Sequence, residues 1–369
     1  MDVTKKLGAV KRNPLIREVG RRVKTGAALL GWNLRAFSDL ATAKGLSGKQ
    51  RLLMIYDFSS QPFSIGDILV IQEASLVLRQ VHGLDRVDFA FVYSPASPVV
   101  LDPTLAHYTP ENFLSHLPHV LQAAQVNPYL GSVFLYDSHR RLEEFVASNL
   151  HTYEIWPHLP QYAYREYLYY RVFNEVLFQY FEKERTLPHL EPRAPARTWA
   201  KAFLERHGGG DVPVTVQLRR NPYNSARDMD NDSWMAFFQF CQGRYPAKFL
   251  VICARDEVDA RLRQCSNVVI AKDHCTSVEQ DLALVDAAAI HMGATSGPGV
   301  MAIFSAKPYC LFKSDLRLDR YKGIIREGNR HALFFAGPAQ SFLFDRETPD
   351  LLAAEFERMW KSIENWSRR

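Results

Sequence analysis

The sequence predicts an α/β protein with two parallel-sheet domains that face a cleft, preceded by a basic helical extension. Its 369 residues are enough for about two domains with sizeable cores. Hydrophobic residues make up 47% and charged residues 23%, which is typical of a globular enzyme and excludes a disordered chain. Short apolar runs alternate with amphipathic stretches through both halves, and this order is typical of open parallel sheets.

In the N-terminal half, each predicted strand is a short apolar run that ends in polar or turn residues. The first strand, 51–57, is followed by Gly66 and Asp67 at the start of an apolar helix that reaches about residue 80. The later elements keep this order, with strands at 87–93 and 131–136 and helices at 110–125 and 162–183. The last of these helices is rich in tyrosine, and we expect it to pack between the domains.

The second domain follows a linker. Residues 187–195 hold three prolines and few apolar side chains, which is typical of a linker. Beyond it we expect strands at 212–218, 248–253, 268–271, 289–292 and 308–312, and helices at 233–241, 257–265, 277–288 and 299–305. This repeated order predicts a Rossmann-like sheet. The resulting division is an extension at 1–50, an N-terminal domain at 51–188, a C-terminal domain at 189–345 and a terminal helix at 346–369.

Positive charge is concentrated at the start of the chain. Residues 1–51 hold twelve Lys or Arg against three acidic residues, a net charge of +9, which leaves −4 for the rest. Apolar residues at spacings of three and four from Ile16 to Phe37 predict one helical stripe beside these charges. We expect this helix either to pack on the body of the protein or to bind an anionic membrane surface, and we expect no nucleic-acid partner.

The cysteines and the first residues bear on location. The five cysteines include no C-x-x-C pair, which argues against a disulfide framework or a structural zinc site. No apolar segment with a cleavage site follows Met1, and the longest weakly polar stretch, 283–306, is too polar to span a membrane. These features predict a cytoplasmic protein, either free or peripheral at the inner face of the membrane.

The most informative motif is the glycine loop from Gly293 to Gly299, which lies between a predicted strand and a predicted helix. Thr295 and Ser296 can cap that helix, and Gly297 lets the backbone approach a ligand, so the loop favours a bound phosphate. The stretch resembles the donor-binding region of GT-B glycosyltransferases, most closely the heptosyltransferase family with its strand, Thr-Gly-Pro, helix pattern. It departs from that pattern at Val300, where the family has a histidine, and at the inserted Ser296.

A second match lies near the first strand. In the same family, the first strand leads into a small-residue loop that reads Gly-Asp, whose aspartate is the proposed catalytic base. Gly66 and Asp67 are the matching residues here. The resemblance therefore implies that Asp67 removes the proton from an acceptor hydroxyl; the alternative is that Asp67 only favours the start of a helix.

Cations follow the strands of the second domain. Gln217, Arg219 and Arg220 come after its first strand, and Lys313 comes after its last. The planar guanidinium of arginine suits a diphosphate, so we expect these residues to bind the donor. GT-B fucosyltransferases also have paired arginines after such a strand, which is a weaker resemblance.

Two further features have ordinary alternatives. His291, beside the glycine loop, is either a site residue or a buried strand histidine. Asp228 and Asp230 form an Asp-x-Asp motif, which holds a metal in GT-A glycosyltransferases but is short enough to occur by chance. We predict no metal site.

The resemblance implies a metal-independent, inverting glycosyltransferase. It would move a sugar from a nucleotide sugar, held by the C-terminal domain, to a glycan or glycolipid acceptor, held by the N-terminal domain, in bacterial surface polysaccharide assembly. No cofactor is expected beyond the nucleotide-sugar co-substrate. Two alternatives stay open: a sugar-nucleotide epimerase of the same fold, and a non-catalytic glycan-binding protein.

Overall fold

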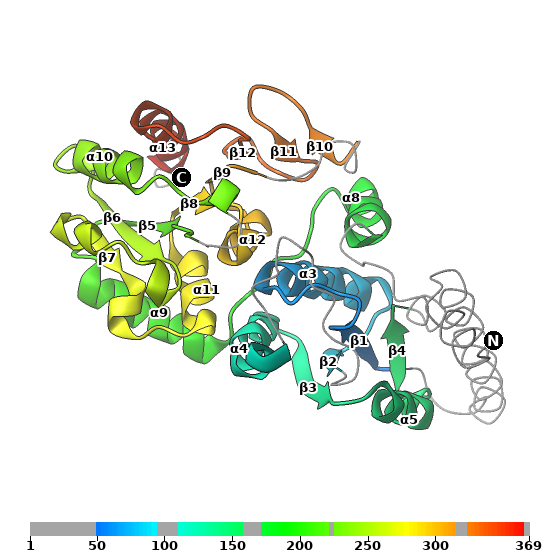
Figure 1. Ribbon diagram of the computed structural model, residues 1–369. Helices are drawn as coiled ribbons and strands as arrows, with labels where there is room; N and C mark the ends of the chain where they lie inside the picture. The colour runs from blue at the N-terminus through cyan, green and yellow to red at the C-terminus, as the bar shows by residue number, and fades with distance from the viewer. Residues whose placement is uncertain (1–48, 94–109, 158–170, 221–224, 315–322, 365–369) are drawn as a thin grey trace, which may run out of the picture.

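The N-terminal domain is built on a four-stranded parallel sheet. A computed structural model describes residues 49–93, 110–157, 171–220, 225–314 and 323–364 (Figure 1). The strands are β1 (Arg51–Asp57), β2 (Arg86–Val92), β3 (Leu130–Tyr136) and β4 (Tyr153–Trp156), in the order β3-β2-β1-β4. The helices are α3 (Ile65–Val81), α4 (Pro110–Gln122) with a 3-10 turn at Ala123–Gln125, and α5 (His139–Asn149).

Both faces of this sheet are covered, which explains why β1 is apolar along nearly its whole length. Leu52, Met54 and Tyr56 join the cluster that includes the buried face of α3. Leu53 and Ile55 point to the other face, where they pack with residues of α5.

The C-terminal domain is built on a six-stranded parallel sheet in the order β12-β9-β8-β5-β6-β7. Its strands are β5 (Val212–Gln217), β6 (Ala247–Ile252), β7 (Val268–Ile270), β8 (Ile290–Ala294), β9 (Tyr309–Phe312) and β12 (Gln340–Phe342). The helices are α9 (Ala194–His207), α10 (Asn231–Cys241), α11 (Val278–Ala287), α12 (Gly297–Ile303) and α13 (Pro349–Glu364). Because strand order reverses between β5 and β8, the carboxyl ends of these two strands form the switch point at which Rossmann-like sheets bind ligands.

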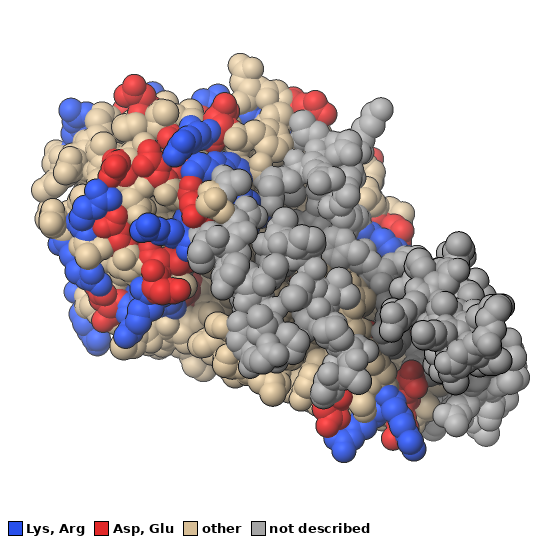
Figure 2. Space-filling model, in the orientation of Figure 1, with Lys and Arg blue, Asp and Glu red and all other residues tan. Residues whose placement is uncertain are grey.

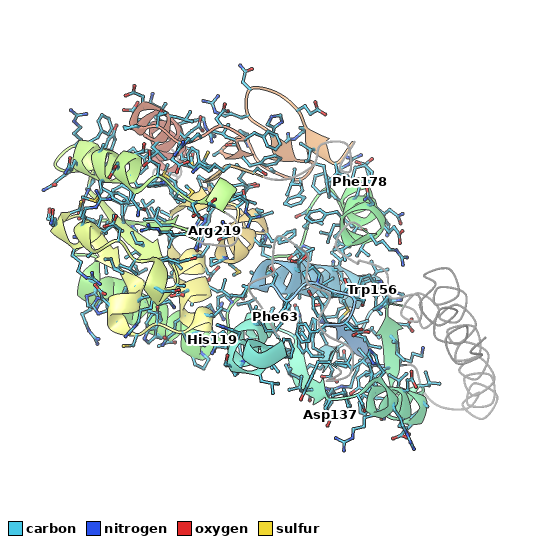
Figure 3. All side chains as sticks on the ribbon, viewed as in Figure 1. Phe63, His119, Asp137, Trp156, Phe178 and Arg219 are labelled. Carbon is cyan, nitrogen blue, oxygen red and sulfur yellow. The ribbon has the colours of Figure 1, made fainter. Side chains whose placement is uncertain are left out.

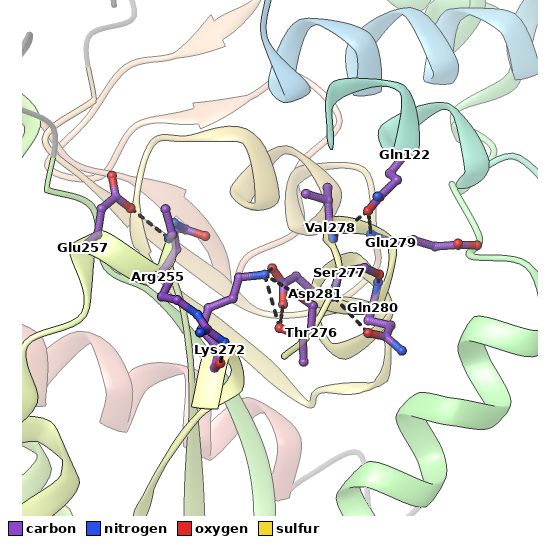
Figure 4. A network of polar contacts seen from close by, with 12 residues as sticks. Gln122, Arg255, Glu257, Lys272, Thr276, Ser277, Val278, Glu279, Gln280 and Asp281 are labelled. Carbon is purple, nitrogen blue, oxygen red and sulfur yellow. Dashed lines mark hydrogen bonds and ion pairs between the residues drawn. The ribbon is translucent and has the colours of Figure 1, made fainter. Parts of the chain in front are cut away.

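The two domains contact each other through helices. In Figure 1, α3 and α4 of the first domain face α11 and α12 of the second. Gln122 at the end of α4 accepts hydrogen bonds from the backbone N–H groups of Val278 and Glu279, at 2.9 and 3.4 Å. This side chain therefore caps the first turn of α11 from the other domain (Figure 4).

A second contact between the domains is aromatic. The antiparallel hairpin β10 (Ile325–Arg326) and β11 (Ala332–Leu333) leads into Phe334. Phe334 packs edge-on against Phe178 and Phe181 of α8 (Phe178–Glu184), at ring-centroid distances of 5.1 and 5.3 Å. Aromatic pairs of this geometry add to the stabilisation that comes from burial alone.

The structure tests several of the elements that we predicted from the sequence. The α/β class with two parallel-sheet domains is confirmed. The helix predicted at 257–265 is wrong: two 3-10 turns, Arg255–Glu257 and Ala260–Gln264, replace it. The side chain of Asp259 accepts from the backbone N–H of Arg261, and such local bonds compete with a continuous α-helix.

Other predictions fall partly or wholly outside the described residues. The basic extension and the first part of the predicted tyrosine-rich helix are among them, so membrane attachment stays a prediction. The later part of that helix is a π-helix, Val172–Leu177, followed by α8. In the part of the chain that the structure describes, every helix is too short or too polar to cross a membrane.

Glu73 is an unusual residue of the core. It lies in the middle of α3 with no exposed surface, and neither carboxylate oxygen has a hydrogen-bond partner. Burial raises the pKa of Glu73 well above its usual value. The folded state therefore keeps a proton that the unfolded chain releases near its ordinary pKa of 4.5, and stability falls as pH rises above that value.

We expect Glu73→Gln to unfold at a higher temperature than the wild type at pH 8, and the difference to shrink at pH 5. Each pH unit between the two pKa values corresponds to about 1.4 kcal/mol. Thermal unfolding followed by circular dichroism at both pH values measures this, with the exposed Glu205→Gln as control. Equal pH dependence in the wild type and Glu73→Gln would contradict the assignment.

Candidate functional site

The candidate site lies at the carboxyl edge of the C-terminal sheet. Strands β5, β8, β9 and β12 are parallel and end at this edge, so the segments that follow them lie near one another. These segments hold most of the predicted donor residues: Gln217 ends β5, Thr295 and Ser296 follow β8, and Lys313 follows β9. The fold thus brings together residues that are up to 96 positions apart in the sequence.

Close pairing of β5 and β8 depends on Gly293. Gly293 lies opposite Gln217, and its φ of 139° is in a region that side-chain-bearing residues rarely adopt. A Cβ there would come within 2.3 Å of the carbonyl oxygen of Gln217. Gln217 itself is buried, and its Oε1 atom has no hydrogen-bond partner.

The two adjacent arginines have different surroundings. Arg219 is buried, and its guanidinium lies 3.3 Å from Oδ1 of Asp228 (Figure 3). The backbone N–H of Met229 donates to the carbonyl of Arg219, which holds the two parts of this loop together. Arg220 is exposed instead. The inward guanidinium is therefore that of Arg219.

A pocket of about 580 Å³ opens at this edge. The segments after β5, β9 and β12 line it, with Ser225, Arg227, Asp228, Met229, Asp230, Lys313, Ser314, Phe344 and Arg346. Three cationic side chains thus face two acidic ones. On the face shown in Figure 2, Lys and Arg are mixed with Asp and Glu over the C-terminal domain.

Lys313 is held in place by residues that are distant in sequence. Its backbone is left-handed, with φ of 49°. Its Nζ atom donates to the carbonyl of Asp228 and lies 3.1 Å from Oε2 of Glu347, whose side chain has no exposed surface. Glu347 also accepts from the backbone N–H of Asp230. One buried carboxylate therefore orients both a pocket cation and the start of α10.

The Asp-x-Asp carboxylates both have protein partners. Asp228 pairs with Arg219. Asp230 is the N-cap of α10 and accepts from the Ser233 hydroxyl at 2.8 Å, a bond that lowers the pKa of Asp230. Among the described residues, no group of three or more His, Cys, Asp or Glu has a geometry suited to a metal ion.

The first turns of α3 and α12 meet across the domain junction. Ser64 is the N-cap of α3, and its hydroxyl accepts from the backbone N–H of Asp67 at 3.5 Å. A Cβ on Gly66 would lie 3.5 Å from the Cα of Gly297, the first residue of α12. Asp67 and the glycine loop, which come from different domains, are therefore neighbours, and the first turn of α12 is covered by α3.

Two residues of the glycine loop have few polar contacts. The hydroxyl of Ser296 is buried and has no hydrogen-bond partner, although Ser296 occupies the N-cap position of α12. The hydroxyl of Thr295 donates to the carbonyl of Phe312 at 3.4 Å, which joins the ends of β8 and β9. The predicted helix cap by these hydroxyls is therefore wrong, because neither hydroxyl reaches a backbone N–H of α12.

His291 lies within the sheet instead of facing the loop. It is 1% exposed, and its Nδ1 atom lies 2.9 Å from the Thr215 hydroxyl. Burial, helped by the charge of Lys307, lowers the pKa of His291 to about 3. The neutral ring is therefore part of the core, and His291 is the buried strand histidine of the second alternative.

Sequence reasoning missed part of the pocket. Arg227 ends a three-residue 3-10 turn, and Phe344 and Arg346 lie in an irregular segment, so no periodic pattern marks any of them. The nearest signal is the mixture of charged residues on both sides of Met229 and beside Phe344.

Comparisons with known proteins identify the fold. No family model matches the chain, and no curated protein sequence matches it. The Escherichia coli ADP-heptose lipopolysaccharide heptosyltransferase II matches with a TM-score of 0.51 at 10% identity, over 85% of this chain and 99% of that one. This likeness confirms the predicted GT-B fold and its resemblance to heptosyltransferases.

Two other solved structures are similar over a large part of the chain. A glycosyl transferase family 9 protein from Veillonella parvula DSM 2008 has a TM-score of 0.47 and 12% identity, over 85% of this chain and 92% of its own. The NodZ α-1,6-fucosyltransferase, crystallised with GDP, has a TM-score of 0.32 and 13% identity, over 72% and 96%. The fold assignment rests on heptosyltransferase II.

The α3–α12 contact requires glycine at position 297. A Cβ there would lie 2.8 Å from the Cβ of Ile65, which is closer than packed side chains allow. We expect Gly297→Ala to lower the free energy of unfolding by about 1–3 kcal/mol, the usual cost of overpacking, as measured by urea denaturation.

Gly337→Ala is the matched control, because its Cβ would have no neighbour closer than 3.8 Å. Ile65→Gly in the Gly297→Ala background removes both the Cβ and the Cγ2 that the new Cβ would meet, so the double variant should recover part of the stability lost in the two single variants together. An unchanged Gly297→Ala protein, or a double variant with no recovery, would show that the contact is not tight.

Proposed function

We propose that the protein is a glycosyltransferase that moves a sugar from a nucleotide sugar to a glycan or glycolipid acceptor in bacterial surface polysaccharide assembly. One observation carries the proposal. The switch-point edge of the C-terminal sheet has a pocket with three cations, and the Asp67 turn of the other domain docks at the same edge. The GT-B fold and its likeness to a heptosyltransferase are consistent with this.

The pocket suits the diphosphate of a nucleotide sugar. Arg227, Lys313 and Arg346 supply positive charge from three separate segments, so they can surround a doubly charged group. Arg219 is two residues beyond the end of β5 and its ion pair with Asp228 can exchange toward an incoming phosphate. Gln217, Thr295, Ser296, Gly297 and Arg220 do not line this pocket, and Ile65 covers Gly297. We propose that these residues contact the donor from the neighbouring segments. Cations in this number can stabilise the leaving diphosphate without a metal, so we propose metal-independent transfer.

Asp67 is proposed as the base. Its side chain is half-buried in the first turn of α3. The preceding residue, Gly66, lies against Gly297. Burial raises the pKa of the Tyr56 phenol, and the negative charge of Asp67 adds to this shift. A carboxylate on the acceptor side of the junction can remove the proton of an acceptor hydroxyl as the sugar is transferred, and direct attack by that hydroxyl inverts the anomeric carbon.

A panel of nucleotide sugars separates this proposal from the two alternatives. Slow release of nucleoside diphosphate in the absence of acceptor indicates a transferase. Formation of an isomeric nucleotide sugar indicates an epimerase, and binding without turnover indicates a glycan-binding protein. The proposal fails if no nucleotide sugar in the panel either binds or reacts.

A substitution of Arg346 tests the donor pocket. Because Arg346 is exposed, we expect its substitution to leave the fold unchanged. We expect Arg346→Gln to weaken binding of the tightest nucleoside diphosphate by roughly tenfold, which corresponds to about 1.4 kcal/mol. Isothermal titration calorimetry measures this, and Arg206→Gln on α9, also exposed, is the control. Equal affinity in all three proteins would place the diphosphate elsewhere.

Asp67→Asn tests the base. The amide keeps the shape of the carboxylate but cannot accept the acceptor proton, so we expect the transfer rate to fall by roughly 10²- to 10⁴-fold with donor binding retained. Asp137→Asn on the same domain is the control, since its exposed ion pair with Arg141 contributes little. Near-normal transfer by Asp67→Asn, with both variants folded, would end the assignment.

A further inference from the structure

An exposed phenylalanine stands at the charged pocket. Phe344 follows β12, and 38% of its surface is exposed. Of the large apolar side chains exposed in the described residues, it is the one that lines this pocket, together with Arg227, Lys313 and Arg346. A single exposed apolar side chain is ordinary, but this ring lies beside three pocket cations, where a ligand that has both a flat group and negative charge can contact both.

The backbone just before Phe344 is fixed by hydrogen bonds to two other segments. Phe342 exchanges two hydrogen bonds with His331, at 3.0 and 2.8 Å. Leu343 donates to the carbonyl of Leu311 and accepts from the backbone N–H of Ser314, at 2.8 and 2.9 Å. The last bond ties the segment after β12 directly to the pocket residues after β9.

The ring itself also has neighbours that hold it. The His331 ring lies 4.7 Å from the Phe344 ring at an interplanar angle of 66°, and the Phe342 ring lies 6.0 Å away at 88°. These are edge-to-face contacts, and because 38% of its surface is exposed, Phe344 still has ring surface open to solvent on which a flat ligand can stack. A ring that is already ordered loses little conformational entropy when a ligand stacks on it.

We propose that Phe344 stacks on the nucleobase of the donor while the pocket cations hold the diphosphate. This inference rests on the proposed function and adds the position of the base. A nucleoside diphosphate has a flat aromatic base at one end and a negatively charged diphosphate at the other. The pocket has the matching pair, an exposed ring and three cations, on adjacent segments. Base–aromatic stacking is sequence-tolerant and contributes substantially to nucleotide binding.

The test compares ligands with and without a base. Calorimetry is carried out on the full-length protein with ADP, GDP, UDP, CDP and inorganic pyrophosphate. For the wild type we expect the tightest nucleoside diphosphate to bind at least tenfold more tightly than pyrophosphate. Phe344→Ala should bind that nucleoside diphosphate about tenfold more weakly and should bind pyrophosphate as the wild type does. Phe344→Tyr, which keeps a flat ring, should bind the nucleoside diphosphate within about twofold of the wild-type affinity.

Tyr129→Ala is the matched control, because Tyr129 is 39% exposed and lies in the N-terminal domain. If Phe344→Ala binds the nucleoside diphosphate as tightly as the wild type, the base lies elsewhere and the inference is wrong even though the proposed function stands. If Phe344→Ala weakens pyrophosphate to the same extent, the ring supports the pocket and does not stack, which also overturns it. If the wild type binds neither kind of ligand, the proposed function itself fails.

Discussion

The contact between the first turns of α3 and α12 determines where the other parts of the site lie relative to one another. Gly66 and Gly297 have no side chains, so the two helices approach until Ile65 lies against the Gly297 backbone. This approach puts the carboxyl edge of one parallel sheet next to the first helix of the other, and it brings Asp67 to the glycine loop. Gln122 adds a second fixed point by capping α11 across the same junction. The relative position of the two domains therefore depends on close backbone packing more than on surface charge.

One pocket cation, Lys313, and the neighbouring Arg219 are held by internal ion pairs. Isolated charges are costly to bury, so Lys313 and Arg219 are each placed beside a carboxylate, Glu347 and Asp228. The partner of Lys313 also binds the backbone at the start of α10, which makes its position part of the fold. Such pairs let positive side chains stay at a partly buried edge before any ligand arrives. The buried Lys272–Asp281 pair, at 2.5 Å and joined by Thr276, serves the same purpose near α11 without facing this pocket (Figure 4).

The comparison of sequence and structure is clearest for particular elements. The run 51–57 is apolar at almost every position because both faces of β1 are covered, and it was predicted with its bounds. The helix predicted at 277–288 matches α11, whose start is fixed by a capping box between Ser277 and Gln280 with both hydrogen bonds present. Strand β4, helix α5 and the β10–β11 hairpin were not predicted. Helix α5 has strongly polar composition, and the strands are only two to four residues long, so their apolar patterns are too brief to recognise.

The sequence by itself determined the α/β class, the order of most strands and helices, the glycine loop and the Gly66–Asp67 turn. These follow from local composition and periodicity, which a chain displays before it folds. Only the tertiary structure decided that Arg219 points inward while Arg220 is exposed, that His291 is a core residue, and that Glu347 orients Lys313. It also decided that Arg227, Phe344 and Arg346 share one pocket. The physical reason is that these residues meet through parallel strands whose order in the sheet differs from their order in the chain, and no local pattern records that pairing.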